Sequence, residues 1–159
     1  MTVYSGTYTP ARPENSASEF RDPLGEAREK LRHAARLPFH ASQPSSWQSQ
    51  FRELTQDARA DIRRHIWLAG LEESPLSDVE QAEPRLNYQV SIQRSEHDLF
   101  SENIDQLVAD ASSRAQVDIW KMIELGERAI LLEMALARHH NRLSELIYES
   151  TLRDVGGAG

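Results

Sequence analysis

Residues 128–147 read RAILLEMALARHHNRLSELI, and this stretch decides what kind of fold the chain adopts. From Ala129 to Ala137 every residue except Glu133 is apolar, so a helix formed here is apolar around almost its whole circumference. A helix of that kind is buried on more than one side. The sequence therefore predicts a helix that packs against several others, in this chain or in a neighbouring one.

Proline placement divides the chain around this stretch. All seven prolines of the 159 residues lie at or before Pro84, and proline interrupts helices. Downstream, apolar residues keep a helical period and predict a long helical region over about 95–153. An unbroken helix here would be roughly 85 Å long, which exceeds a compact domain. We expect either a hairpin broken near Ser112 or Gly126, or a long helix that packs along other chains.

Two shorter helices are predicted upstream, over about 23–37 and about 45–69, because apolar residues recur there at helical spacing. Asp22 and Pro23 have the residue types favoured at the N-cap and at the first helical position. Gly70 has the type favoured just after a helix ends. These signals define the bounds of the two helices.

Three capping boxes occur after residue 22. One of them, Ser77 with Glu80, is followed by Pro84, which soon stops any helix there; the other two predict helix starts. Ser45 with Gln48 would begin the second helix, and Ser113 with Gln116 would begin a new helix after a break in the long region. In such a box the two side chains satisfy backbone N–H groups that have no partner inside the helix.

Residues 86–92 leave two interpretations open. Their apolar residues alternate with polar ones, which is a strand pattern. A lone strand would need a ladder partner, and the sequence downstream is helical, so we favour a lead-in to the next helix. The alternating residues are Leu86, Tyr88, Val90 and Ile92.

The fold class that follows is all-α: a helical bundle or hairpin with a long C-terminal helix and an extended N-terminal arm. Residues 1–22 are rich in Ser, Thr and Pro and are predicted to form the arm. Residues 23–159 are predicted to form one helical domain.

Composition narrows the classes of function. The net charge of −7 argues against a general nucleic-acid binder, and the absence of cysteine excludes disulfides, Cys-ligated zinc and thiol catalysis. No apolar run approaches the roughly 18–20 residues of a membrane span. The chain begins with neither the basic start nor the apolar run of a signal peptide. We expect a protein with no membrane span and no nucleic-acid partner, in the cytoplasm or within a large assembly.

The adjacent pair His139 and His140 is the first place to look for a metal site. Neighbours on a helix point about 100° apart, so one ion can rarely reach both rings. Arg138 and Arg142 flank the pair and would repel a cation. The sequence therefore favours a solvated or interfacial pair.

Two further histidines follow a carboxylate at a spacing of four residues, namely His33 after Glu29 and His65 after Asp61. This spacing is typical of pairs that stabilise a helix. No Glu-x-x-His, HExxH, nucleophile-elbow or phosphate-loop motif occurs in the chain. We therefore expect no catalytic residues, no metal ligands and no cofactor.

The wide apolar stripe favours a non-enzymatic structural or adaptor subunit that assembles into a larger complex through helix packing. Its partners would be copies of itself or other subunits. Two alternatives stay open: an accessory or catalytic subunit of an enzyme complex, and a small acidic regulator or inhibitor protein. The candidate interface residues are Trp120, Ile130, Leu131, Met134, Leu136 and Leu143.

Overall fold

The structure is a computed structural model that describes residues 22–39 and 42–154. These residues form helices and no strand, which confirms the all-α prediction. Residues 1–21 of the predicted arm lie outside the described residues. The elements are α1 (Pro23–Ala35), α2 (Pro44–Ala69), α3 (Pro75–Ala82), the 3-10 turn η1 (Pro84–Leu86), α4 (Asn87–Ala111) and α5 (Ile119–Asp154).

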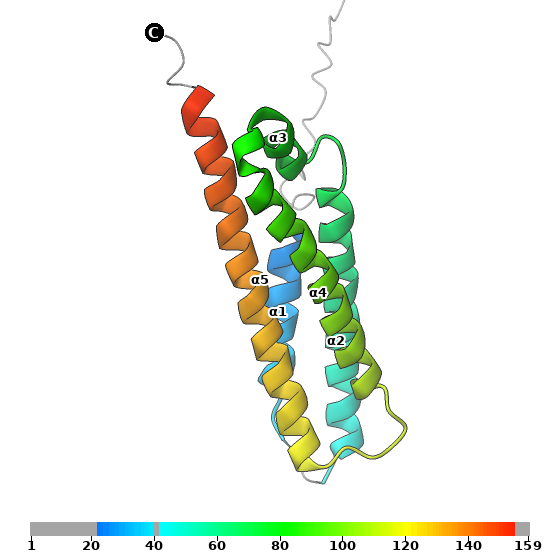
Figure 1. Ribbon diagram of the computed structural model, residues 1–159. Coiled ribbons are helices and arrows are strands. Elements are labelled where there is room, and N and C mark those ends of the chain that lie inside the picture. The colour runs from blue at the N-terminus through cyan, green and yellow to red at the C-terminus, as the bar shows by residue number, and fades with distance from the viewer. Residues whose placement is uncertain (1–21, 40–41, 155–159) are drawn as a thin grey trace, which may run out of the picture.

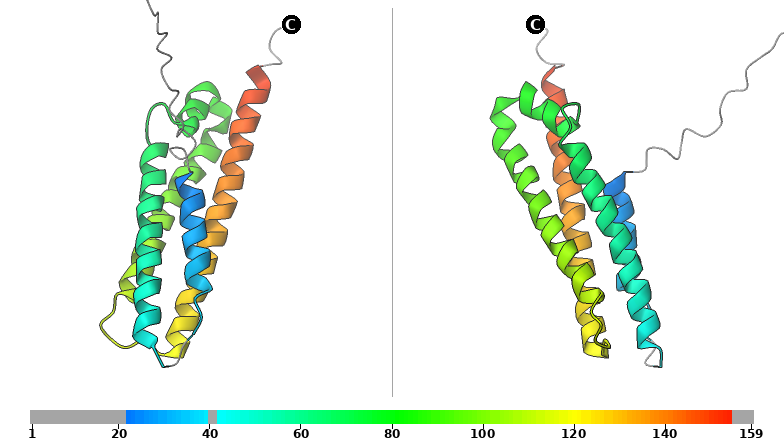
Figure 2. Two further views of the ribbon diagram at one scale, coloured as in Figure 1. Left: turned by 180° about the vertical axis from the view of Figure 1, so that it is seen from behind. Right: turned by 90° about the vertical axis from the view of Figure 1, so that its right-hand side faces the viewer.

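Four of these helices form an elongated bundle in which chain neighbours run antiparallel (Figure 1). Helix α1 packs on α2 and α5, and α4 packs on the same two helices, so α1 and α4 lie at opposite corners. Helix α3 and η1 close the end of the bundle where α2 stops and α4 starts. Figure 2 shows that α1 is much shorter than α5, which runs on towards α3.

The predicted ends of the first two helices are confirmed in part. Asp22 caps α1, since its Oδ1 accepts a hydrogen bond from the backbone N–H of Leu24 (3.1 Å). Gly70 follows the last residue of α2 as predicted. The capping box at Ser45 is wrong, because α2 begins at Pro44 and has no side-chain cap.

Gln48, the second residue of that expected box, bonds across the bundle instead. Its Nε2 donates to the carbonyl oxygens of Ala111 (3.1 Å) and Ser113 (2.8 Å). These carbonyls lie at and just beyond the end of α4, where no intrahelical donor is available. Gln48 thus ties the start of α2 to the end of α4, a role that only the tertiary arrangement provides.

The long helical region is broken near Ser112, between α4 and α5, and Gly126 lies inside α5. Of the two expected break positions, the structure therefore uses the first. The capping box predicted at Ser113 is wrong. Asp118 acts in its place, because its Oδ1 accepts a hydrogen bond from the backbone N–H of Lys121 (2.8 Å).

Residues 86–92 are helical, as the favoured interpretation had it, and belong to η1 and the start of α4. Their alternation is explained by the packing, since Leu86 and Val90 are buried while Tyr88 and Ile92 are exposed. None of the helices in the described ranges is both long and apolar enough to cross a membrane.

Along the apolar stretch of α5, burial does not follow the hydropathy of the residues. Glu133, its one charged residue, is buried, and the Nε atoms of Arg28 (3.0 Å) and Arg32 (3.3 Å) from α1 donate to its Oε1. The apolar Leu131 and Met134 are 62% and 46% exposed. This chain therefore covers one side of the helix and leaves apolar side chains on the other.

Two apolar clusters form the core of the described residues. The larger one fills the bundle between α1, α2, α4 and α5, and includes Phe51, Ile62, Phe100, Ile104 and Leu136. The smaller one lies where α3 and η1 meet α4 and α5, and consists of Leu76, Val79, Leu86, Val90 and Leu146.

Candidate metal centre

Three histidines from three helices meet in the interior of the bundle. They are His65 of α2, His97 of α4 and His139 of α5, and all three side chains are buried. The Nε2 atoms of His65 and His97 each lie 3.3 Å from His139 Nε2. One potential ligand nitrogen of each ring lies within 4.8 Å of the other two.

The histidines occupy a polar layer between the two apolar clusters. In α4, His97 lies between Val90 of the smaller cluster and Phe100 of the larger one. In α5, Leu136 of the larger cluster precedes His139 by one turn. The Phe100 ring meets the His139 ring edge to face, with centroids 5.1 Å apart. The centre therefore has an apolar wall on the side of the larger cluster.

A carboxylate outside the layer fixes the orientation of His139. Its Nδ1 lies 2.7 Å from Glu96 Oε2, and the guanidinium of Arg142 pairs with the other oxygen of Glu96. An ionised carboxylate only accepts hydrogen bonds, so His139 Nδ1 carries the proton. In the neutral ring, Nε2 then presents its lone pair to the other two histidines. Metal-ligating histidines commonly have such a partner.

The three rings cannot satisfy one another by hydrogen bonding. His139 Nε2 has one lone pair, so it can serve as a good acceptor for one N–H group only. Both His65 Nε2 and His97 Nε2 approach it at the same distance. If one of them donates, the other is left facing a nitrogen whose lone pair is already engaged. A buried polar group in that position is unfavourable.

A single bound cation would remove this conflict, because it accepts a lone pair from every ring. Zn²⁺ binds imidazole nitrogens at about 2.0–2.1 Å in tetrahedral geometry, which places ligand atoms about 3.3–3.4 Å apart. The two separations of 3.3 Å at His139 Nε2 match that value. Two of the three ligand pairs are thus at coordination distance, and the third lies within 4.8 Å.

The electrostatics of the layer keep the rings neutral. Burial, with the adjacent histidines adding to it, lowers the pKa of His97 and of His139 to about 3. Burial also lowers the pKa of His65. Imidazole must be unprotonated to bind a metal ion, so the three side chains are in the form that coordination requires.

Three of the residues expected at an interface lie at the surface of α5. Trp120 is 76% exposed, and Leu131 and Met134 are exposed as well. Ile130 is half-buried. These side chains are available to a partner.

The two other expected interface residues lie within the bundle. Leu136 is fully buried in the larger apolar cluster. Leu143 is half-buried and packs against the smaller cluster. Both contribute to the core of this chain.

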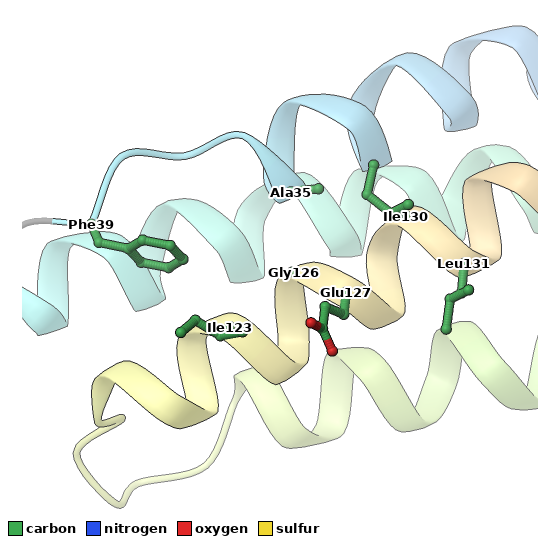
Figure 3. A pocket seen from close by; sticks show the side chains of 7 residues that line it. All are labelled: Ala35, Phe39, Ile123, Gly126, Glu127, Ile130 and Leu131. Carbon is green, nitrogen blue, oxygen red and sulfur yellow. The ribbon is translucent and has the colours of Figure 1, made fainter.

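An apolar pocket of about 460 Å³ opens beside the exposed face of α5, where the end of α1 approaches it (Figure 3). Ile123 and Ile130 from α5 and Phe39 from the segment after α1 line it. We call the residues that line this pocket the α1–α5 face. One of them, Glu127, is charged and the others are apolar; the members are Ala35, Phe39, Ile123, Gly126, Glu127, Ile130 and Leu131.

Sequence reasoning did not group the three buried histidines. It paired His65 with Asp61, whose carboxylate contacts Lys30 of α1 in the structure. It also paired His139 with His140, but the two separate: His139 points inward, while His140 Nδ1 lies 3.6 Å from Asp22 Oδ2 near the surface.

A usable signal was nevertheless present in the sequence. Each of the three histidines continues an apolar stripe, at a position where a core side chain is expected: His65 in the helix predicted over about 45–69, and His97 and His139 in the long helical region over about 95–153. One buried histidine in an apolar stripe is common, but three in the predicted core suggest a shared site. Comparisons of the chain with protein-family models, with curated proteins and with solved structures give no match.

Proposed function

We propose that this protein binds one divalent transition-metal ion, Zn²⁺ in the first place, through His65, His97 and His139. The observation that carries the proposal is the pair of 3.3 Å separations that link three buried imidazoles from three helices. Glu96 supports it, because a carboxylate on His139 Nδ1 makes Nε2 the ligand atom.

The ligand set selects the class of metal. Three neutral imidazoles suit Zn²⁺, Cu²⁺ and Ni²⁺ better than Mg²⁺ or Ca²⁺, which prefer oxygen ligands. The two 3.3 Å separations at His139 Nε2 equal the ligand spacing around a tetrahedral Zn²⁺ ion, so Zn²⁺ is the first candidate among the three metals. We expect Co²⁺ to bind in the same geometry and to serve as a coloured probe.

The test is a titration of metal-free protein with Zn²⁺ against a chromophoric chelator. The wild type should bind one equivalent of Zn²⁺. Loss of a residue that only hydrogen-bonds a metal ligand lowers metal affinity about 10–100-fold, so His139→Ala, which removes a ligand, should lower the Zn²⁺ affinity by more than that. His140→Ala is the matched control, since its ring is half-exposed and next in sequence. A wild type without stoichiometric binding, or a His139→Ala variant with wild-type affinity, would overturn the proposal.

Folding of the variants needs its own check. Circular dichroism should show the same helicity for wild type, His139→Ala and His97→Gln. His97→Gln keeps a polar side chain of similar size in the layer and should also lose Zn²⁺ affinity. Weak binding by a folded His97→Gln variant therefore assigns the loss to the missing ligand.

A second proposal concerns assembly, and the exposed apolar side chains of α5 favour it. As a structural or adaptor subunit, the protein would associate with copies of itself through the α1–α5 face and Trp120. The metal centre lies inside the bundle, so it is compatible with this role. It is also compatible with a catalytic subunit of an enzyme complex, because a histidine-bound ion can act as a Lewis acid.

Sedimentation velocity tests the self-association. The wild type should sediment as an oligomer whose share rises with concentration. Leu131→Glu should sediment as a monomer, because it replaces an exposed apolar side chain of the α1–α5 face with a charged one. Glu102→Gln, at an exposed position of α4, is the control for a change of surface charge. A wild type that stays monomeric at tens of micromolar would contradict this second proposal and leave the first untouched.

A further inference from the structure

Gln93 is a fourth polar residue of the layer, and its side-chain oxygen is unused. The residue is 2% exposed. Its Oε1 is buried and has no hydrogen-bond partner among residues 22–39 and 42–154. Buried carbonyl oxygens are nearly always paired, so this one requires an explanation.

Helix geometry places Gln93 beside the histidines. It precedes His97 by four residues in α4, a spacing at which two side chains are neighbours on one face. Both side chains are buried, so this shared face is the inner one. Val90, one turn closer to α3, belongs to the smaller apolar cluster and bounds the layer on that side.

The three histidines fill three of the four positions that a tetrahedral ion offers. We propose that a water molecule takes the fourth position and donates a hydrogen bond to Gln93 Oε1; this inference rests on the proposed metal site. An amide oxygen only accepts hydrogen bonds, and a metal-bound water is a good donor, so the two are complementary. The centre would then be an open one, of the kind that exchanges small ligands.

A cavity of about 190 Å³ lies between α4 and α5. Gln93, Ile92 and Leu146 line it, together with Arg142 and the carboxylates Glu145 and Glu149. Gln93 belongs both to the lining of this cavity and to the buried face of α4 that carries His97. It thus lies where a small ligand would pass from the cavity to the histidine layer.

Gln93 would also determine which small ligands the proposed metal centre binds best. Its oxygen stabilises a ligand that carries a proton, such as water, and repels a ligand that presents only lone pairs. Removal of the oxygen should therefore strengthen the binding of an acceptor-only anion. A mere loss of packing around position 93 does not strengthen the binding of such an anion, so a rise in its affinity is specific to removal of the oxygen.

The experiment uses Co²⁺-loaded protein and follows its visible absorption during titration with azide. Azide should shift the wild-type spectrum, and Gln93→Leu should bind azide about five- to tenfold more tightly. Gln89→Leu is the matched control, because it is the same change one turn earlier at an exposed position lining the same cavity. It should leave azide affinity unchanged.

Each failure has a different meaning. If Co²⁺ does not bind the wild type, the metal site itself is refuted. If Co²⁺ binds but azide leaves the spectrum unchanged, the fourth position is closed and the inference about Gln93 is overturned alone. Equal azide affinity in wild type and a folded, Co²⁺-binding Gln93→Leu variant overturns it as well.

Discussion

His139 Nδ1 lies 2.7 Å from Glu96 Oε2, so a carboxylate on α4 sets the orientation of an imidazole on α5. The guanidinium of Arg142, one turn after His139, holds the same carboxylate from the outside. This relationship decides which nitrogen of His139 faces the interior. It also connects the bundle surface to the proposed metal centre.

Replacement of Glu96 should weaken metal binding without abolishing it. We expect Glu96→Ala to lose about 10–100-fold in Zn²⁺ affinity, because His139 is then free to rotate and to change tautomer. Glu96→Gln should recover part of the loss, since its amide oxygen can still accept from Nδ1–H. Chelator competition measures both, with Glu102→Ala in α4 as the control; wild-type affinity in Glu96→Ala would contradict the assigned role.

Zn²⁺ should stabilise the fold. At a free concentration of about 100 times its Kd, a ligand that binds only the native state adds ~2.7 kcal/mol to the free energy of unfolding. For a chain of this size this corresponds to a rise in Tm of about 5–10 °C. Differential scanning calorimetry with and without Zn²⁺ measures the shift, and His139→Ala should show almost none. An equal shift in both proteins would indicate binding elsewhere.

Glu133 should matter to stability more than an exposed carboxylate does. Removal of one partner from a deeply buried ion pair costs about 3–5 kcal/mol. The Arg32 side chain is 41% exposed, so solvent screens part of this interaction. We expect Glu133→Gln to lower the free energy of unfolding by about 1–2 kcal/mol in urea denaturation. The exposed Glu127→Gln should change it little; equal effects of the two would refute the structural role.

Gly126 offers a stabilising substitution. It lies inside α5, and an added Cβ would meet the Ala35 carbonyl oxygen at 3.8 Å, an ordinary contact distance. Gly126→Ala should therefore gain about 0.5–1 kcal/mol from the reduced backbone entropy of the unfolded chain. Thermal denaturation should show a rise in Tm of about 1–4 °C. Gly126→Val should fall below Gly126→Ala, and a lower Tm for Gly126→Ala than for wild type would contradict the observed packing.

The helices themselves could be predicted because their signals are local. Asp22 and Pro23 mark the start of α1, Gly70 marks the end of α2, and the absence of proline after Pro84 predicts the long helices. Capping was less predictable. Gln48 has the right spacing for a capping box, in which its side-chain oxygen would accept a hydrogen bond. In the folded chain its Nε2 instead donates to two carbonyl oxygens at the end of α4.

Burial within a helix could be predicted only in part. The apolar stretch of α5 correctly indicated a helix with apolar side chains beyond those its own chain covers, as Leu131 shows. The residue pattern did not reveal that Glu133 of this stretch is buried. That burial depends on two arginines of α1, which pair with the Glu133 carboxylate. Leu136 and Leu131 have the same residue type, and only the position of α1 and α4 separates core from surface.

The sequence by itself determined that this chain forms amphipathic helices, where α1 begins and α2 ends, and that one of the helices is unusually apolar. These properties depend on residues three or four positions apart, which a helix brings together whatever the rest of the chain does. The metal centre has no such local cause. His139 is 42 residues from His97 and 74 from His65, so no spacing motif links them. Only the packing of α2, α4 and α5 in the bundle brings the Nε2 atoms of His65 and His97 to 3.3 Å from His139 Nε2, because it sets one turn of each helix at the same level of the bundle.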